Sequence, residues 1–535
     1  MASLTFYGGI REIGGNQILL EDADTRIFLD FGMSFSQKNA FYDEFLQPRT
    51  NACLRDQLKL GFIPDLDGLY RQDLIKIEGI DKSTKEYKCP EYWSCDIKSY
   101  KDYVKEKGKP FIDCVLLTHA HADHFQYISF LDPEIPVYCS PETKVMLKAI
   151  QDVSKSSIEQ EICTVKERGL TTTGESSFFP NETKISTVAT QERDIVAKKP
   201  LEEFKVGSLK ITPIPVDHSV PGAYAFYIKT KDKKILYTGD LRFHGRLKER
   251  SEQFTEFLKN NPVDVLLVEG TRIEKESKDD EFQVEADIKS MIEKSPGLVI
   301  IDFGWKDTTR FETIQKVAEE TGRMLVVNPK LAYLLHYLSK ELPDHFKPIE
   351  SYDNVRCYVK RRENMTYADG DCKKFKHNAG YILDWDKKLM KTDEDYKTSL
   401  ITHLRNGVKA YEIRKNPGNY IIMLSFFDMN ELFDIEPPEG SKYICAHCEP
   451  FNDEMLSDQN KLKQWLDKFN LLETSEQDLD HFHASGHASR NEIKELVEQI
   501  NPKIIYPIHT LKPDEFLKFH KNVIWDIKLG EKYEI

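Results

Sequence analysis

The chain has 535 residues, of which 40% are hydrophobic and 31% are charged, and its formal net charge is −14. A chain of this length and composition buries full hydrophobic cores in about three or four units, which excludes a disordered protein and a small disulfide scaffold. The acidic balance excludes indiscriminate coating of nucleic acid, although a metal centre in a local groove could still bind a phosphodiester.

The N-terminal residues lack a basic region followed by an apolar stretch, and no run of about 18 apolar residues follows along the chain. Several of the ten cysteines lie inside apolar runs, as is typical of buried thiols in a reducing compartment. We therefore expect a cytoplasmic protein that is not attached to a membrane.

Short apolar runs alternate with amphipathic stretches, which predicts an α/β fold. The predicted strands are 4–7, 18–20, 26–29, 112–117, 136–138, 209–216, 235–237, 264–268, 297–302, 324–327, 420–424 and 503–507. The predicted helices are 141–152, 283–293, 308–320, 330–339, 452–469 and 490–500.

Residues 35–110 interrupt this alternation with a mixture of aromatic, charged and turn residues. Because the stretch falls between two predicted strands, it is predicted to be an insertion. Two interpretations stay open at this point: a surface subdomain that packs on itself, or a lid or wall that faces substrate.

A dense group of metal-binding residue types follows the apolar strand 112–117. It consists of His119, His121, Asp123 and His124 within six residues. Imidazole nitrogen and carboxylate oxygen are ligands that zinc and manganese accept, and such side chains would pack poorly at a strand end without a ligand. The segment therefore predicts a metal site.

Three further residues of these types stand at the ends of apolar strands. They are His218 after ITPIPVD, Asp240 at the end of KILYTGD, and His509 at the end of KIIYPIH. A single histidine at a strand end is more often a hydrogen-bonded surface residue. Their shared position at strand ends predicts one convergent site with ligands enough for two metal ions.

These motifs resemble the metallo-β-lactamase fold and, more narrowly, the β-CASP nucleases. That group adds an acidic residue after a strand, an inserted domain and two late histidines, which here are Glu269, His487 and His509. The stretch HASGHAS at 483–489 and the glycine-rich opening GGIREIGGN at 8–16 resemble ribonuclease J. The resemblance covers most of the chain except for about 35–110, and with 26 residues after His509 we expect no counterpart of the extra C-terminal domain of bacterial ribonuclease J.

The resemblance implies a domain organisation and a set of ligands. It implies an αββα metallo-β-lactamase sandwich at 1–34 and 111–274 with an insertion at 35–110, a β-CASP domain at 275–475, and a return to the sandwich at 476–535. Two divalent ions, with zinc as the default and manganese as the alternative, would be held by two ligand sets that share Asp240: His119, His121 and His218 in one, and Asp123, His124 and His509 in the other.

It also implies catalytic roles. The catalytic residues would be Asp123, which also binds metal, His487 and Glu269. His487 would act as general acid near neutral pH, and Glu269 would orient it. For Glu269 the alternative is a buried acid that caps a loop.

The segment 483–489 has a second interpretation that needs no family. Ser489 with Glu492 forms a capping-box pattern at the start of the helix 490–500. Free backbone N–H groups at such a helix start favour a phosphate. We therefore expect substrate phosphate near His483, Ser485, Gly486 and Ser489, while a well-capped helix is the simpler interpretation.

Two features suggest where nucleic acid would run. Asp302 ends a predicted strand and Arg310 starts the next helix, as at the cleft-facing edge of a β-CASP domain. Five basic or histidine residues follow Asp240 closely and could grip backbone phosphates: Arg242, His244, Arg246, Lys248 and Arg250.

The leading hypothesis is a metal-dependent ribonuclease that acts on single-stranded RNA. The alternatives are a DNA nuclease, a small-molecule metallohydrolase, and an inactive scaffold subunit. The roughly 200-residue insertion argues against a small-ester enzyme, and the complete set of ligand types argues against an inactive scaffold. Endonuclease or 5′-exonuclease action and the oligomeric state stay open.

Overall fold

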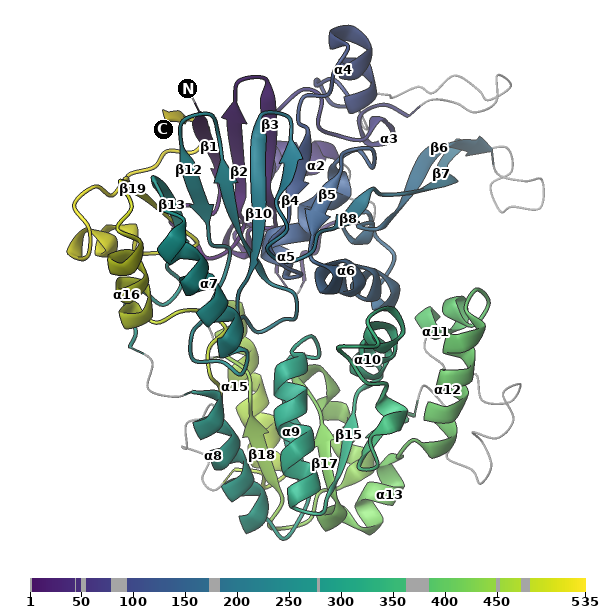
Figure 1. Ribbon diagram of the computed structural model, residues 1–535. Coiled ribbons are helices and arrows are strands. Elements are labelled where there is room, and N and C mark those ends of the chain that lie inside the picture. The colour runs from purple at the N-terminus through teal and green to yellow at the C-terminus, as the bar shows by residue number, and fades with distance from the viewer. Residues whose placement is uncertain are drawn as a thin grey trace.

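The computed structural model describes residues 2–43, 45–49, 54–77, 94–172, 183–276, 280–361, 384–448, 453–472 and 482–535. Two stacked sheets with helices outside them form the upper part of Figure 1, and a third sheet with its own helices lies below. This arrangement confirms the predicted α/β fold, an αββα sandwich with an inserted α/β domain. The domain boundaries given above stay predictions.

The first sheet of the sandwich joins both ends of the chain. Its strand order is β20 (Lys532–Glu534), β1 (Ser3–Gly8), β2 (Gln17–Asp22), β3 (Thr25–Phe31), β4 (Cys114–Leu116), β5 (Val137–Cys139) and β8 (Ile195–Ala197). The strands from β20 to β3 are antiparallel, and those from β3 to β8 are parallel. In the parallel half, β4 leads directly into the histidine-rich segment that begins at His119.

The second sheet supplies the other strand ends of the site. Its order is β19 (Ile504–Ile508), β13 (Val265–Glu269), β12 (Lys234–Tyr237), β11 (Tyr224–Lys229), β10 (Leu209–Pro215) and β9 (Phe204–Val206). All five residues of β13 are buried, as expected for a strand covered on both faces. A core of apolar side chains, among them Phe6, Leu29, Ile211 and Phe226, fills the space between the two sheets.

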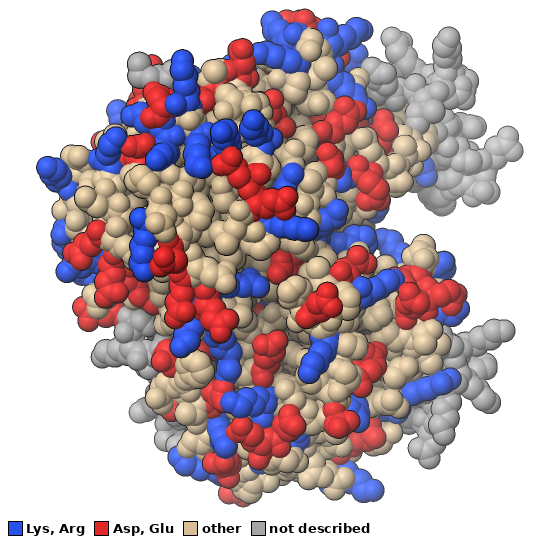
Figure 2. Space-filling model, in the orientation of Figure 1, with Lys and Arg blue, Asp and Glu red and all other residues tan. Residues whose placement is uncertain are grey.

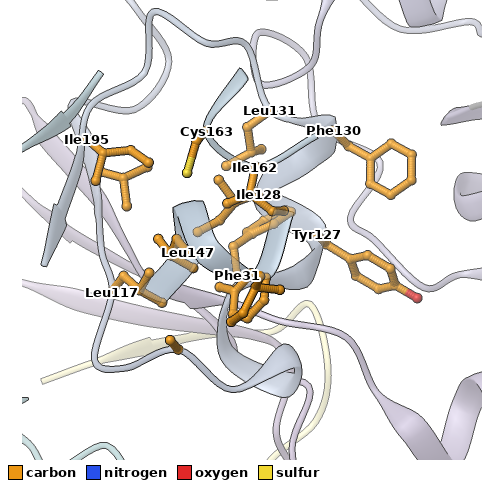
Figure 3. Close-up of a cluster of buried hydrophobic side chains, with 14 of the residues drawn as sticks. Phe31, Leu117, Tyr127, Ile128, Phe130, Leu131, Leu147, Ile162, Cys163 and Ile195 are labelled. Atoms are coloured by element: carbon orange, nitrogen blue, oxygen red, sulfur yellow. The ribbon is translucent and has the colours of Figure 1, made fainter. Parts of the chain in front are cut away.

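Helices cover both outer faces of the sandwich. The first sheet is covered by α1 (Phe35–Asn39), α2 (Leu54–Leu60), α3 (Gln72–Ile75), α5 (Ala122–Phe125) and α6 (Pro141–Val153), with α4 (Tyr100–Lys107) beside them. The second sheet is covered by α7 (Lys248–Asn260) and α16 (Arg490–Ile500). Figure 3 shows part of the first outer core, where Phe31 and Leu117 of the sheet side meet Ile128 and Leu147.

The described residues of the insertion at 35–110 pack into this outer core. Its residues Leu54, Phe62, Tyr70 and Leu74 share one buried cluster with Phe28 of the first sheet. Of the two interpretations, this packing does not favour a subdomain that packs only on itself, because these apolar side chains complete the helical layer over the sheet.

The inserted domain is built on a parallel sheet of order β16 (Val355–Cys357), β15 (Met324–Val327), β17 (Tyr420–Met423), β14 (Val299–Asp302) and β18 (Lys442–Cys445). One face is covered by α8 (Glu281–Lys294), α9 (Thr308–Glu320) and α10 (Pro329–Glu341), and the other by α13 (Ala410–Lys415), α14 (Leu432–Ile435) and α15 (Asp453–Lys468). The helices α11 (Asp384–Leu389) and α12 (Glu394–Asn406) lie at one side.

The inserted domain and the sandwich share buried surface. Side chains of α10 and α12, among them Leu334, Leu338 and Tyr396, belong to the same cluster as Leu147 of α6. The Tyr333 hydroxyl donates to Asp152 Oδ2 at 2.7 Å. Apolar contact and a hydrogen bond thus hold the two domains together at this end of the interface.

The predicted elements agree with the structure where periodicity and caps coincide. The bounds of α9 and α16 are as predicted, since each helix has a side-chain cap, Asp307 and Ser489 respectively. The sequence analysis missed the hairpin of β6 (Thr164–Thr172) and β7 (Thr183–Glu192), the strands β8, β9, β11, β16, β18 and β20, and several helices, among them α7 and α12. Within the described residues, no helix combines the length and the apolar character needed to cross a bilayer.

Candidate metal centre

The metal-binding residues predicted from four separate segments lie together. The segment from His119 to His124 follows β4, and His218, Asp240 and His509 follow β10, β12 and β19. They form two groups that share Asp240, and within each group the donor atoms lie within 4.8 Å of one another. Parallel strand ends at one edge of the sandwich therefore produce the convergence that the sequence predicted.

The first group consists of His119, His121, His218 and Asp240. The Nδ1 atom of His121 lies 3.1 Å from Nε2 of His119 and 3.1 Å from Nε2 of His218. Asp240 Oδ2 lies 3.6 Å from Nε2 of His119. Donor atoms around a four-coordinate zinc ion, with bonds of about 2.0–2.1 Å, lie about 3.3 Å apart. The group therefore has the spacing of one metal site.

The second group consists of Asp123, His124, Asp240 and His509. His509 Nε2 lies 3.1 Å from Asp123 Oδ2, and His124 Nε2 lies 3.2 Å from Asp240 Oδ2. Because Asp240 Oδ2 also lies 3.7 Å from His509 Nε2, this one carboxylate faces both groups. Asp240 is therefore the residue that the two groups share.

Two observations test whether these residues fit a metal. His124 Nε2 and Asp240 Oδ1 are buried and find no hydrogen-bond partner among the described residues, a costly arrangement unless a ligand satisfies them. Burial also lowers the pKa of His119 and of His121 well below the usual histidine range, and that of His218 to about 4. Neutral imidazole is the form that binds metal, so these three histidines fit a divalent cation, while the unpartnered His124 Nε2 and Asp240 Oδ1 favour a ligand in the second group.

Outer partners hold the remaining nitrogens of the ligand histidines. His124 Nδ1 lies 2.7 Å from Asp30 Oδ2, His509 Nδ1 lies 2.8 Å from Thr271 Oγ1, and His218 Nδ1 donates to Gly486 O at 2.5 Å. Such contacts fix the ring orientation and leave the other nitrogen for the metal. Sequence analysis missed Asp30 and Thr271, although Asp30 is an acidic residue near the end of a strand.

The glycine-rich opening supports the backbone of Asp123. The N–H groups of Gly15 and Asn16 donate to Asp123 O at 3.0 and 3.2 Å. Gly14 has φ +79°, and a Cβ there would stand 2.5 Å from Asp123 Cβ. The glycine therefore serves a close approach of two loops.

A third group places His487 beside the metal ligands. His487 Nδ1 lies 3.0 Å from Glu269 Oε2 and 3.8 Å from Asp240 Oδ2. Burial alone would lower the pKa of His487, but Glu269 and Asp240 outweigh it and raise the pKa to about 9. Glu269 is fully buried at the end of β13, and it also accepts from the N–H of Leu241. The imidazole is therefore held protonated at neutral pH, with 22% of its side chain exposed.

The segment from His483 to Ser489 runs between the two domains to the start of α16. Gly486 fits tightly, since a Cβ there would lie 3.0 Å from His218 Cε1. His483 Nδ1 is buried without a hydrogen-bond partner among the described residues, and Ser485 is half-buried. Ser489 is 2% exposed, and its hydroxyl bonds with Glu492 in the predicted capping box, so it is engaged in the helix cap rather than presented to a ligand.

Comparisons with known proteins agree with this geometry. Residues 102–300 match the beta-lactamase superfamily domain, and residues 477–518 match the Zn-dependent metallo-hydrolase RNA specificity domain. Ribonuclease J of Sinorhizobium meliloti is 21% identical over 409 residues, which cover 74% of this chain and 57% of that protein. The chain is similar to β-CASP metallo-β-lactamase proteins of the ribonuclease J-like group.

Two further relatives bear the same printed name. Ribonuclease J of Mycoplasma genitalium is 20% identical and covers 94% of this chain and 67% of its own length, and that of Pyrococcus abyssi is 20% identical and covers 95% and 90%. A solved protein of unknown function from Enterococcus faecalis V583 shares the fold, with a TM-score of 0.64, 22% identity and 99% coverage of both chains. The chain spans little more than half of the Sinorhizobium protein.

The basic residues after Asp240 do not form the phosphate-gripping surface that we expected. Arg242 is fully buried, 3.2 Å from Asp217 Oδ1 and 3.1 Å from Glu281 Oε1, and Arg246 pairs with Glu285. That expectation is wrong for these two arginines, because carboxylates of the β-CASP domain and of the sandwich already neutralise them. Arg310 of the β-CASP domain is buried in the same network, 2.9 Å from Glu281 Oε1.

These paired arginines hold the backbone of the histidine loop instead. Arg242 Nη1 donates to Ser485 O at 3.3 Å, and Arg310 Nη1 donates to Phe482 O at 2.7 Å. His244 Nε2 lies 3.0 Å from the same Ser485 oxygen. The β-CASP domain and the sandwich thus position the loop from two sides.

Sequence analysis also missed Lys306, which follows β14 in the β-CASP domain. Burial lowers the pKa of Lys306 to about 8, while the charge of Asp123 opposes that effect. The ammonium group therefore stays mainly protonated at neutral pH. No sequence motif marks this residue, since only the folded chain brings it to the sandwich.

Proposed function

We propose that the chain is a metal-dependent ribonuclease that hydrolyses phosphodiester bonds of single-stranded RNA. The observation that carries the proposal is the shared Asp240, which belongs to all three groups of donor side chains, including the one that contains His487. Two metal sites with a positioned acid beside them suit in-line displacement at a phosphate. The printed names of the relatives and of the RNA specificity domain support RNA as the substrate.

Two divalent cations, with zinc as the default and manganese as the alternative, would polarise a phosphate oxygen and activate water when held by the two groups. Two bound cations would offset the repulsion between RNA and the acidic protein. The net charge is −14, and Figure 2 shows basic and acidic side chains interspersed over one face of the molecule. Binding of RNA would thus depend on the centre more than on the general surface charge.

His487 would act as general acid. A protonated imidazole can donate to the leaving oxygen, and Glu269 at 3.0 Å keeps the ring oriented and charged. Asp123 would contribute through its metal site. The partial exposure of His487 leaves it open to substrate, whereas Glu269 acts through it as a positioning residue.

The loop from His483 to Gly486 would receive a phosphate of the substrate. The unsatisfied His483 Nδ1 and the half-buried Ser485 stand just before the N-terminus of α16, where backbone N–H groups favour an anion. The resemblance to ribonuclease J implies that this phosphate can be a 5′-monophosphate, and we include 5′-exonuclease action in the proposal.

The test is degradation of matched RNA and DNA oligonucleotides, each with a 5′-monophosphate or a 5′-hydroxyl group, with and without chelator. Chelator-sensitive cleavage of RNA with preference for the monophosphate is expected. Cleavage of DNA alone would replace RNA by DNA in the proposal. Absence of cleavage by protein with confirmed bound metal would contradict it.

Variants separate the roles within the centre. His487→Ala should keep bound metal and lower kcat by about 10²–10⁴-fold, the usual contribution of a general acid. Asp240→Ala should lose both metal and activity. His345→Ala, at an exposed histidine of the β-CASP domain, is the matched control and should leave bound metal and kcat unchanged. Normal turnover of His487→Ala would remove the general acid from the proposal.

A further inference from the structure

Lys306 belongs to the β-CASP domain, yet its charged neighbours lie in the sandwich. It stands on the loop between β14 and α9, and it interacts electrostatically with His121 and Asp123, one residue from each of the two metal groups. The side chain is half-buried, so it keeps access to solvent.

The loop that carries Lys306 is fixed on both sides of this residue. Trp305 packs against the buried cluster that the two domains share and also against the core of the β-CASP domain. Asp307 caps α9 by accepting from the N–H of Arg310 at 2.9 Å, and its own N–H donates to Gly304 O at 2.9 Å. The backbone on both sides of Lys306 is therefore held in a defined position.

The ammonium group of Lys306 is left without an internal counter-ion. Within the part of the chain that the structure describes, it makes no hydrogen bond and no ion pair, whereas Arg242, Arg246 and Arg310 of the same interface are all paired with carboxylates. Asp123, whose charge acts on Lys306, lies 3.1 Å from His509 and would be taken up by metal. A half-buried cation beside a metal centre gains most from an anion that arrives with the substrate.

We propose that Lys306 binds a backbone phosphate of the nucleic-acid strand on the side of the centre formed by His121 and Asp123. This inference rests on the proposed ribonuclease function and adds a substrate contact from the β-CASP domain. Because the contact recognises phosphate and not a base, it would act on any sequence. It would also make strand binding depend on both domains, since the metal ligands come from the sandwich and this cation from the inserted sheet.

The test measures binding separately from chemistry. In the His487→Ala background loaded with metal, the affinity for a 5′-monophosphorylated single-stranded RNA is determined over a range of salt concentrations. Lys306→Met should weaken binding about 10-fold to 100-fold, as expected for a hydrogen bond to a charged group. The slope of log affinity against log salt should fall by about 0.7, the value for one lost phosphate contact on a single strand.

Three controls keep the result interpretable. Lys316→Met removes the same charge from the outer side of α9, where Lys316 pairs with Glu285, and should leave affinity and slope unchanged. Lys306→Arg should restore the slope. Metal content and thermal midpoint are measured for every variant, and Lys306→Gln serves as a second neutral variant if Lys306→Met fails to fold.

The outcomes separate the inference from the proposed function. If wild type cleaves RNA but both neutral variants bind with unchanged affinity and slope, Lys306 does not contact phosphate and the ribonuclease proposal stands. If affinity falls while the slope stays the same, the lysine has only a structural role and the inference is wrong. If wild type neither binds nor cleaves RNA, both proposals fall together.

Discussion

At the scale of single residues, each candidate histidine ligand is held through the ring nitrogen that faces away from the metal groups. Asp30, Thr271 and the carbonyl of Gly486 occupy that nitrogen in His124, His509 and His218. Asp30 is itself held, because it accepts from the Tyr237 hydroxyl at 2.6 Å and from the N–H of Thr118 at 2.8 Å. A chain of hydrogen bonds therefore presets the second metal group.

Asp30→Asn should weaken metal binding about 10-fold to 100-fold, because the amide no longer offers a negative acceptor to His124 Nδ1. Competition with a chelator of known affinity measures the change. Asp24→Asn, at an exposed carboxylate at the turn between β2 and β3, should have no effect. Equal metal affinity in the two variants would show that Asp30 does not orient His124.

A second residue-scale prediction concerns Asp132, which lies away from the metal centre. Burial raises the pKa of Asp132 to about 6, although hydrogen bonding by the N–H of Glu134 opposes the rise. The raised pKa means that the folded protein favours the neutral acid. Ionisation of Asp132 therefore lowers the free energy of unfolding. This loss is absent below the ordinary pKa of 3.8 and reaches its full size above about pH 6.

Asp132→Asn should accordingly stabilise the protein at pH 7 by up to about 3 kcal/mol and leave it unchanged near pH 3.5. Thermal midpoints across this pH range measure the difference. Asp194→Asn, at an exposed aspartate, is the control and should show no such trend. A constant difference at all pH values would contradict the assigned cause.

At the scale of elements, the site depends on turns that follow strands. The backbone after β3 passes so close to the loop of Asp123 that a Cβ on Gly32 would stand 1.7 Å from Asp123 O. The Gly32 N–H donates to Asn16 O at 3.0 Å. Absence of a side chain, rather than a special φ angle, is what this position requires.

Gly32→Ala should displace the Asp123 loop, lower stability by about 1–3 kcal/mol or more, and reduce the metal content. Thermal unfolding and metal analysis measure the two effects. Gly304→Ala is the matched control, since Gly304 also follows a strand and a Cβ there would meet no atom within 4 Å. Full metal occupancy in Gly32→Ala would contradict the predicted displacement.

At the scale of the whole molecule, one carboxylate ties the two domains together at the cleft. Glu281 starts α8 of the β-CASP domain and lies 3.1 Å from Arg242 of the sandwich and 2.9 Å from Arg310. All three side chains are fully buried. Both arginines also hold the loop before His487, so the domain interface and the candidate acid are mechanically connected.

Glu281→Ala should lower stability by about 3–5 kcal/mol, because it leaves buried guanidinium groups without a compensating charge. Activity should fall as well, since the loop before His487 loses its support. Glu320→Ala, which removes an exposed partner of Lys289, should change stability by less than about 1 kcal/mol. Thermal midpoints measure the loss of stability and turnover measures the loss of activity in both variants.

The sequence by itself determined the local elements and the identity of the chemical groups. Helices with a cap and a clear apolar period, such as α9 and α16, were predicted to the residue, and the strand-end histidines and acids were found because their residue types are unusual there. Short strands such as β8, β9 and β11 escaped prediction, since three to six residues carry too little periodicity.

Only the tertiary structure decided which charges are free and which groups meet. In the sequence, Arg242 and Lys306 are simply two basic residues. In the structure, Arg242 is neutralised by Asp217 and Glu281, whereas Lys306 interacts electrostatically with Asp123 of the metal centre. Asp30 and His124 are 94 residues apart and meet because β3 and β4 are neighbours. Pairing and burial depend on contacts between distant segments, and local patterns of charge and hydrophobicity do not encode those contacts individually.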